Sequence, residues 1–417
     1  MKNSFLKKVF LVSFIIPYVA YGQAFQVNLQ GQKQQAMGSA GTAFAQDAAI
    51  LFYNPGGMVF IEEKNSILFS GNATLSNSAF QDELTKQVSR TNSPIGTPFS
   101  MYTIFNLKNF NKLDTVSNLK FGIGIYTPFG SSIRWEDGWS GRFALTSIKL
   151  KAIFFQPTLS YRFTENFGIG AGLVYSDGSV ELKKDIPVQD AQGNYGKASL
   201  KGKANGFGFN IGLYFCPAKK VSIGISYRSR VQMQVKSGEA SFEVPSSLSQ
   251  NFPNGKFSSS LPLPSIFTLG LAVKANEKVN LTFDVNYGGW NAYKALEFDY
   301  ENNTSSLKDT YSERNYKNNF AFRFGFQYKK DDKTFYRFGA GYVLSPVPDG
   351  YVTPETPDAN RVNLTCGYGY NISEKFCLDA SLTFAQPGRK DKNIETQLEG
   401  TYRTIVFIPG ISLLYSF

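Results

Sequence analysis

Few side chains in this 417-residue chain are of the types that carry catalytic or metal chemistry. The chain has no histidine, which excludes histidine acid–base catalysis, Ser-His-Asp and Cys-His nucleophiles and most transition-metal sites. The three cysteines, Cys216, Cys366 and Cys377, show no C-x-x-C spacing, and their odd number does not suggest a disulfide framework. The sequence therefore predicts no catalytic residue, no metal site, no cofactor and no enzyme activity.

The charged residues suit binding better than catalysis. Lysine and arginine number 43 against 32 acidic residues, which gives a net charge of +11. Four basic residues near the ends of predicted strands could supply the cation that a carboxylate ligand needs: Arg142, Arg314, Lys317 and Arg361. Each also fits a solvated or loop-pairing role, and Asp358 is a nearby partner for Arg361. Because acidic residues are scattered among the basic ones, no nucleic-acid partner is predicted.

Residues 1–22 have the pattern of a secretory signal peptide. Lysines near the start precede an apolar run from Val9 to Val19, and Ala20-Tyr21-Gly22 fits a small-x-small cleavage site. A membrane-anchoring helix is the alternative, but Pro17 and the cleavage pattern follow too closely for a full span. The sequence therefore predicts an exported protein whose mature chain begins near Gln23.

Alternation of apolar and polar residues is the dominant pattern beyond residue 63. In VNLTFDVNY (279–287) every second residue is apolar, which is the period of a β-strand with two different faces. Tight turns alternate with loops of up to tens of residues, which is the pattern of an outer-membrane barrel. Fourteen segments are predicted as strands: 66–77, 99–108, 118–129, 149–163, 166–180, 203–216, 219–233, 264–275, 278–287, 319–330, 334–344, 361–372, 375–385 and 403–417.

These segments predict an all-β fold, a membrane-spanning antiparallel β-barrel of about 14 strands over residues 63–417. A closed barrel satisfies every strand hydrogen bond within a bilayer, and an even strand number returns both termini to the periplasm. The chain ends in GISLLYSF, which resembles the terminal-strand signal that the barrel-assembly machinery reads. A secreted β-sandwich is the alternative, but fourteen strands would overfill a single sandwich.

Residues 23–62 form the one extended segment before the strands, and they are rich in glycine and alanine. The segment GSAGTAFAQDAAI (38–50) is weakly helical in character, and Asn54, Pro55 and Gly56 then break it. A barrel of fourteen strands has room inside for more than its own side chains. We therefore predict a hatch, a small plug inside the lumen, with a disordered periplasmic tail as the alternative.

The end of the third predicted strand carries two residues that interrupt a regular ladder. Pro128 lacks a backbone donor and Gly130 lacks a side chain, so both are candidates for an opening in the barrel wall. Trp135, Trp139 and Phe143 follow, and they are predicted to form an outer capture patch or part of the membrane girdle.

Four motifs in this order resemble the FadL/TodX family of outer-membrane transporters for long-chain fatty acids and hydrocarbons. Ala24–Asn28 with GSAGTAFAQDAAILFYNPGG resembles the family's N-terminal stretch and its N-P-A hatch, with Gly56 in place of the alanine. TPFGSSIRWEDGWSGRF, VNLTFDVNYGGWNAY and SPVPDGYVTPETPDANR resemble three further segments, the last most specifically. The resemblance covers the whole mature chain, and it implies that Phe25 reaches into the ligand pocket.

The resemblance implies passive capture of a hydrophobic ligand at the outer loops and lateral release through the wall, gated by the hatch. Long-chain fatty acids are the expected ligands, and the expected partners are this ligand, outer-membrane lipid and the barrel-assembly machinery, with the protein a monomer. A general diffusion porin for small polar solutes is the main alternative. An outer-membrane lipase is disfavoured by the absence of histidine, whereas an adhesin or phage-receptor role of the loops stays open.

Overall fold

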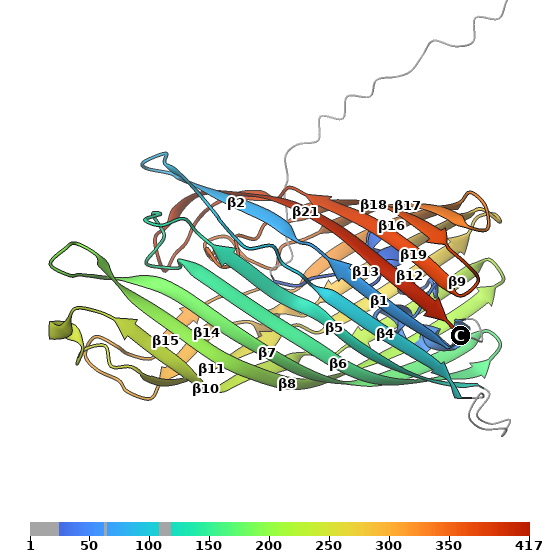
Figure 1. Ribbon diagram of the computed structural model, residues 1–417, viewed down its shortest axis with the longest axis horizontal. Helices are drawn as coiled ribbons and strands as arrows, with labels where there is room; N and C mark the ends of the chain where they lie inside the picture. The colour runs from blue at the N-terminus through green and yellow to red at the C-terminus, as the bar shows by residue number, and fades with distance from the viewer. Residues whose placement is uncertain (1–24, 62–64, 108–117) are drawn as a thin grey trace, which may run out of the picture.

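The computed structural model describes residues 25–61, 65–107 and 118–417, so the predicted signal peptide lies outside the described residues. Its wall is a closed antiparallel barrel of fourteen strands, as predicted (Figure 1). The first strand pairs with the last, from Ser66–Ser416 to Asn72–Gly410, and this ladder closes the barrel. The wall strands are β1 (Ser66–Asn72), β4 (Phe99–Asn106), β5 (Leu119–Arg134), β6 (Ser147–Thr164), β7 (Phe167–Gln189), β8 (Tyr195–Ala218), β9 (Val221–Arg228), β12 (Ile266–Lys274), β13 (Val279–Gly288), β16 (Asn319–Lys329), β17 (Thr334–Val343), β18 (Arg361–Asn371), β19 (Phe376–Ala385) and β21 (Glu399–Ser416).

The outer surface of the wall is apolar and its inner surface is polar. On β16, Phe320, Phe322 and Phe324 are exposed, whereas the alternating Ala321 and Arg323 are buried. An exposed row of phenylalanines would be unfavourable in water, but it is what a lipid-facing strand requires. Among the described residues, none of the helices is long and apolar enough to cross a membrane.

Seven further strands among the described residues extend the wall at the loop end, and some of the wall strands run further than the sequence suggested. The predicted long loop between 180 and 203 is wrong: β7 continues to Gln189 and β8 begins at Tyr195 (Figure 1). Alternation persists there, but its outward residues are charged because they lie beyond the apolar band. The additional strands are β2 (Leu75–Asp82), β3 (Val88–Arg90), β10 (Val231–Glu243), β11 (Gly255–Leu263), β14 (Ala295–Tyr300), β15 (Thr310–Glu313) and β20 (Gly388–Lys392), and the short helices there are η4 (Ser246–Leu248) and η5 (Trp290–Ala292).

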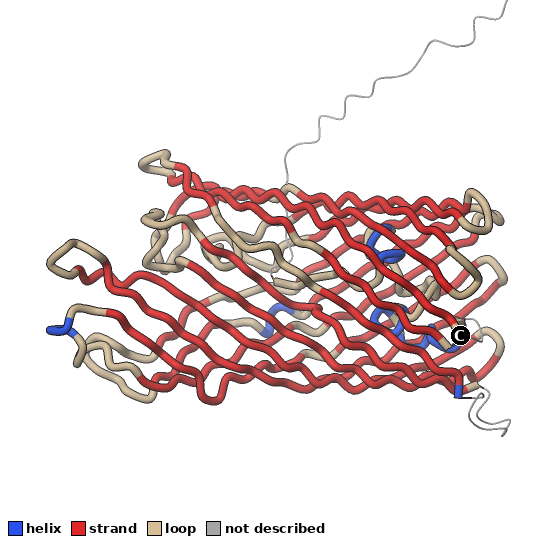
Figure 2. The backbone as a smooth tube through the Cα atoms, viewed as in Figure 1, coloured by secondary structure: helices blue, strands red, loops and turns tan. Residues whose placement is uncertain are grey.

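The described part of the N-terminal segment, residues 25–61, lies inside the barrel. It forms α1 (Gln32–Ala36), α2 (Ile50–Tyr53) and η1 (Pro55–Phe60), joined by irregular backbone (Figure 2). All three helices are short, and nearly every residue in them is buried. α1 packs against β17, β18 and β19, and η1 packs against β6, β7 and β8.

All three cysteines are free. Cys366 on β18 is exposed and Cys377 on β19 is buried, so they face opposite sides of the wall.

Candidate functional site

Asn54, Pro55 and Gly56 anchor the hatch to the wall. The Asn54 side chain accepts a hydrogen bond from the Gly56 backbone N–H at 3.0 Å and so caps η1. Its amide also donates to the carbonyl of Thr42 at 3.0 Å and to that of Leu213 on β8 at 2.9 Å. The predicted break therefore positions one side chain that joins the hatch to itself and to the wall.

A glycine is needed at position 56 because the hatch backbone approaches the wall closely there. Backbone conformation is not the reason, since the φ of Gly56 is not positive. A Cβ at this position would lie 2.6 Å from the carbonyl oxygen of Gly212. We expect Gly56→Ala to destabilise the hatch locally by about 1–3 kcal/mol. The measurable result is roughly 5- to 150-fold faster hydrogen exchange of backbone amides in residues 50–60.

Gly71→Ala on β1 is the matched control, because nothing lies within 4 Å of a Cβ built there. Its exchange rates in residues 50–60 should equal those of the wild type. Equal rates in Gly56→Ala would show that the wall adjusts freely and that this contact does not hold the hatch.

Buried charges inside the barrel also tie the hatch to the wall. The Lys33 ammonium lies 3.8 Å from a carboxylate oxygen of Asp47 and 4.0 Å from one of Asp379 on β19. Arg337 on β17 donates to Asp379 at 2.7 Å. On the other side, Asp284 on β13 accepts from the backbone N–H groups of Gly41 and Thr42, each at 3.0 Å.

Two further arginines bind the hatch backbone. Arg228 on β9 donates to the Phe52 carbonyl at 2.6 Å and to the Tyr126 hydroxyl at 2.6 Å. Arg323 on β16 donates to the Gly38 carbonyl at 3.2 Å. Sequence reasoning missed these lumen charges. The available signal was a charged residue at an inward position of an apolar alternating strand, as in FAFRFGF and FCLDASL.

The wall is interrupted beside β5, where the sequence placed Pro128 and Gly130. The ladder between β4 and β5 ends at Ser100–Tyr126, and β5 has a bulge between Tyr126 and Phe129. Residues 90–92 meet β5 again only near Arg134 and Trp135. The edge of β5 between these two contacts is therefore left without a neighbouring wall strand.

The beginning of the hatch occupies this edge. Val27 N–H donates to the Pro128 carbonyl at 2.8 Å, and Gly130 N–H donates to the Phe25 carbonyl at 3.1 Å. Gln26 and Phe129 form the antiparallel bridge between these two hydrogen bonds. Hatch residues 25–27 thus take the place of a wall strand along this edge.

The Phe25 side chain is buried in an aromatic cluster inside the wall. Its ring lies edge-on to Trp290 at 5.1 Å and to Tyr293 at 6.1 Å, measured between centroids. Tyr316 packs against both of these rings. Trp290 Nε1 and the Tyr316 hydroxyl are buried and, among the described residues, have no hydrogen-bond partner. The cluster is therefore apolar, with two unused donors.

The four predicted carboxylate-binding residues lie in different surroundings and are not brought together. Arg314 is buried and pairs with Glu355 at 2.7 Å, and Lys317 is exposed. Arg361 begins β18, and its Nε is buried without a hydrogen-bond partner in the described part of the chain. Of the four, only Arg361 retains a buried donor that is unused.

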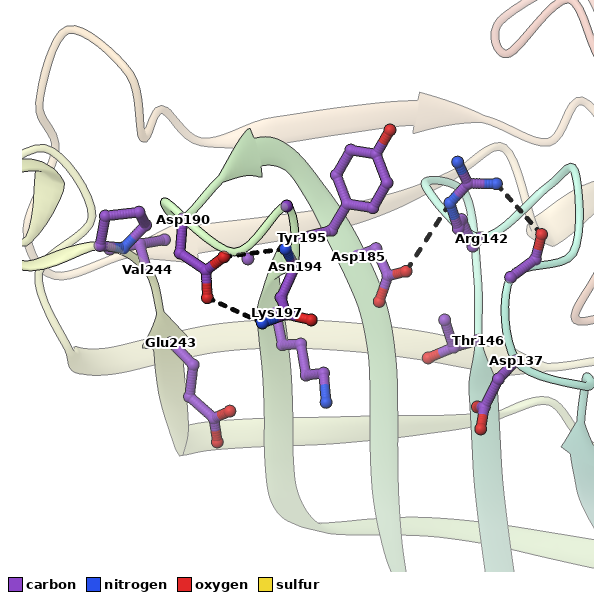
Figure 3. A pocket seen from close by; sticks show the side chains of 14 residues that line it. Asp137, Arg142, Thr146, Asp185, Asp190, Asn194, Tyr195, Lys197, Glu243 and Val244 are labelled. Carbon is purple, nitrogen blue, oxygen red and sulfur yellow. Dashed lines mark hydrogen bonds and ion pairs between the residues drawn. The ribbon is translucent and has the colours of Figure 1, made fainter.

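Arg142 lies in a polar pocket of about 980 Å³ at the loop end (Figure 3). Its guanidinium stacks on the rings of Phe143 and Tyr195 and lies 4.0 Å from Asp185. In the same pocket, hydrogen bonds from the side chain and backbone of Asn194 hold the pKa of Asp190 below its usual value. The lining is mainly charged and polar, so this pocket is not suited to an acyl chain.

The prediction that Trp135 and Trp139 form an exposed capture patch or a girdle is wrong. Both indoles are buried, and they stack on each other with centroids 4.3 Å apart. Phe80 and Tyr402 complete this cluster. These residues form a core for the outer loops instead, because loops that extend this far beyond the membrane need apolar packing of their own.

Barrel, apolar outer band and plugged lumen together define an outer-membrane transport channel with an internal hatch. The model of the family described as "Outer membrane protein transport protein (OMPP1/FadL/TodX)" matches residues 14–417, and the chain belongs to this family. It is an outer-membrane transporter of hydrophobic compounds, in a family of transport channels rather than enzymes.

Individual relatives are distant in sequence. A long-chain fatty acid transport protein of Escherichia coli is 22% identical over 342 residues, covering 71% of this chain and 75% of the relative. The crystal structure of a Pseudomonas aeruginosa FadL homologue has a TM-score of 0.79 at 17% identity, covering 95% and 100% of the two chains. That of a Ralstonia pickettii toluene transporter has a TM-score of 0.71 at 16% identity, covering 94% and 99%.

Proposed function

We propose that this protein takes up long-chain fatty acids and releases them laterally through the barrel wall, gated by the hatch. Ligand capture occurs at the long loops, which lie outside the cell, and both chain termini lie in the periplasm. Two observations support this orientation: the C-terminus lies at the end with short turns (Figure 1), and the number of strands is even. Closure of the wall within one chain supports a monomer.

The observation that carries the proposal is the replacement of a wall strand by hatch residues 25–27. Two backbone hydrogen bonds connect this segment to β5, and each contributes only about 1 kcal/mol net. Its withdrawal would open the wall between β4 and β5 directly toward the lipid. The exit would therefore be at Pro128 and Gly130, and the segment that closes it would be the end of the hatch.

A lateral route suits a hydrophobic ligand energetically. Burial of each methylene contributes about 0.8 kcal/mol, so an acyl chain gains little by re-entering water on the periplasmic side. An apolar cavity of about 50 Å³ lies toward the loop end of the barrel. It is lined mainly by Leu150, Val180, Met233, Val235, Leu261 and Leu263. Ligand pockets are usually about 300–1,000 Å³, so an acyl chain enters only when side chains or the hatch move.

Recognition of a carboxylate is assigned to Arg361 together with Tyr316 and Trp290. Arg361 Nε, the Tyr316 hydroxyl and Trp290 Nε1 are the unused buried donors described above. The Lys317 N–H donates to the Pro346 carbonyl at 2.8 Å, and the neighbouring Ser345 hydroxyl donates to Asp358 at 2.8 Å, so the segments that carry Tyr316 and Arg361 lie close together. Tyr316 also contacts the rings around Phe25, so the polar and apolar ends of a ligand would meet at the hatch.

Arg361→Gln is expected to lower oleate uptake while leaving toluene uptake unchanged, because only oleate has a carboxylate. A charge-assisted hydrogen bond contributes about 1.5–3 kcal/mol, which corresponds to roughly 10- to 150-fold in apparent affinity. The measurement is uptake of radiolabelled oleate and toluene over a range of concentrations. Lys317→Gln is the control, since Lys317 is exposed, and it should match the wild type. Equal losses for both substrates would refute a carboxylate-specific role.

The function itself is tested by uptake of the same two substrates in cells with and without the gene, and in cells that produce a variant protein without residues 23–34. Gene-dependent oleate uptake that this deletion abolishes would support a fatty-acid transporter gated by the hatch. Uptake of toluene alone would change the substrate class. Conductance to small polar solutes with uptake of neither would favour a general diffusion porin.

A further inference from the structure

The outward face of β6, β7 and β8 carries lysines just beyond the apolar band, on the side toward the loop end of the wall. These three strands run side by side (Figure 1), and their register aligns the outward residues in rows. The last fully aromatic row is Phe155, Tyr175 and Phe207, all exposed. Four residues further along each strand, the row is Lys151, Ser179 and Lys203.

Lys236 extends this row onto the next strand. It lies in the β10 bulge between Gln234, which pairs with Asn205, and Glu239, which pairs with Lys201. It therefore lies on the stretch of β10 that faces residues 202–204 of β8. Lys151, Lys203 and Lys236, here called the lysine row, are exposed, and none forms an ion pair within the described chain. By contrast, Lys183 and Lys201 in the neighbouring rows pair with Glu181 at 3.0 and 3.5 Å.

The lysine row has the spacing of a headgroup site. It lies about 13 Å along the strands from the aromatic row, or roughly 10 Å along the barrel axis at the usual strand tilt. Lysine side chains reach several ångströms back toward the membrane. Lys151 and Lys203 flank β7 at a backbone separation of about 10 Å. One amphiphile could therefore contact the aromatic rings with its chains and the lysines with its headgroup.

This part of the wall carries more basic than acidic residues. The outward and loop-end residues of β6 to β10 include Lys149, Lys197 and Arg230 besides the lysine row and its neighbours, against Asp177, Glu181, Asp185, Glu239 and Glu243. Farther round the barrel, β14 and β15 carry acidic residues instead: Glu297, Asp299 and Glu313. An anion is therefore attracted to the outward face of β6 to β10.

We propose that the lysine row binds the phosphate groups of an anionic glycolipid whose acyl chains pack on Phe155, Tyr175 and Phe207. The site is on the outer leaflet, given the orientation proposed above. Basic residues at a membrane surface contribute about 1 kcal/mol each toward anionic lipid. The bound lipid lies on the outside of the wall and takes no part in ligand transport.

The test is titration of the full-length purified protein with bis-phosphorylated lipid A, followed by native mass spectrometry. Lys151→Gln/Lys203→Gln/Lys236→Gln should bind on the order of 100-fold more weakly than the wild type. Lys256→Gln/Lys294→Gln/Lys308→Gln is the control, because it removes the same charge from exposed loop-end lysines elsewhere. It should bind within about twofold of the wild type. Dephosphorylated lipid A should bind the wild type as weakly as the lysine-row variant binds the phosphorylated form.

Three results would overturn the proposal: equal binding by the lysine-row variant and the wild type, equal binding of both lipid forms, or full displacement by an equal concentration of inorganic phosphate. Gel mobility of unheated samples establishes that each variant retains a folded barrel. Uptake is measured on Lys203→Gln/Lys236→Gln, because Lys151 also lines the apolar cavity proposed for the acyl chain. Oleate and toluene uptake by this double variant should equal the wild-type rates. A failure of the transport proposal would instead show as absent uptake in the wild type with lipid binding intact.

Discussion

Asp379→Asn is expected to release the hatch from one side of the lumen and to open the barrel to small polar solutes. Asp379 is 1% exposed and accepts from Arg337 at 2.7 Å, with the Lys33 ammonium 4.0 Å away. Its loss leaves a buried arginine without its carboxylate and weakens the pairing of Lys33. Breaking a buried pair by removing one partner costs about 3–5 kcal/mol. Withdrawing the hatch admits water to Arg337 and relieves this cost while the ladders of the wall stay intact.

Conductance of the purified protein in planar bilayers checks this result. We expect the wild type to be largely closed and Asp379→Asn to conduct small ions at least about tenfold more often. Asp349→Asn is the control: Asp349 also pairs with an arginine, Arg389 at 2.6 Å, but its side chain is 96% exposed. Arg337→Gln/Asp379→Asn removes both members of the closest pair and should partly restore closure. Wild-type conductance in Asp379→Asn would show that the carboxylate does not hold the hatch.

The wall was predictable from the sequence because its two faces meet different solvents. Lipid outside and a polar lumen inside impose the same alternation on every strand, as VNLTFDVNY in β13 shows. Beyond the bilayer this constraint ends. Residues 181–189 therefore suggested a loop although they continue β7, since their outward side chains are charged and only Leu182 and Ile186 mark the inner face.

The site was less predictable because its partners are distant in sequence. The break at Asn54 was visible, but its contact with Leu213 depends on how the hatch is folded back. Arg314 was predicted either to bind a carboxylate ligand or to pair within the loops, and its partner Glu355 is too distant in sequence to be identified in advance. Pro128 and Gly130 lie on the part of β5 that lacks a neighbouring wall strand, but nothing local indicated that residues 25–27 pair with it.

Locking these residues to β5 is expected to abolish transport. In antiparallel pairs like Gln26 and Phe129, which lie between two hydrogen bonds, the Cα atoms are about 4.5 Å apart. That separation is within the range that a disulfide spans. Gln26→Cys/Phe129→Cys, with the three natural cysteines changed to serine, should therefore form a covalent closure of the wall. Thr353→Cys/Thr356→Cys, across an isolated bridge in an outer loop, is the control.

Oleate uptake by the oxidised and reduced forms of Gln26→Cys/Phe129→Cys is the most direct test of lateral release. Both states have the same sequence, so the effect of removing the Phe129 ring is the same in each. We predict at least about tenfold lower uptake in the oxidised state, recovery on reduction, and no redox effect in the loop control. Oleate uptake at the same rate in both states, with the disulfide shown to be formed, would contradict an exit gated by residues 25–27.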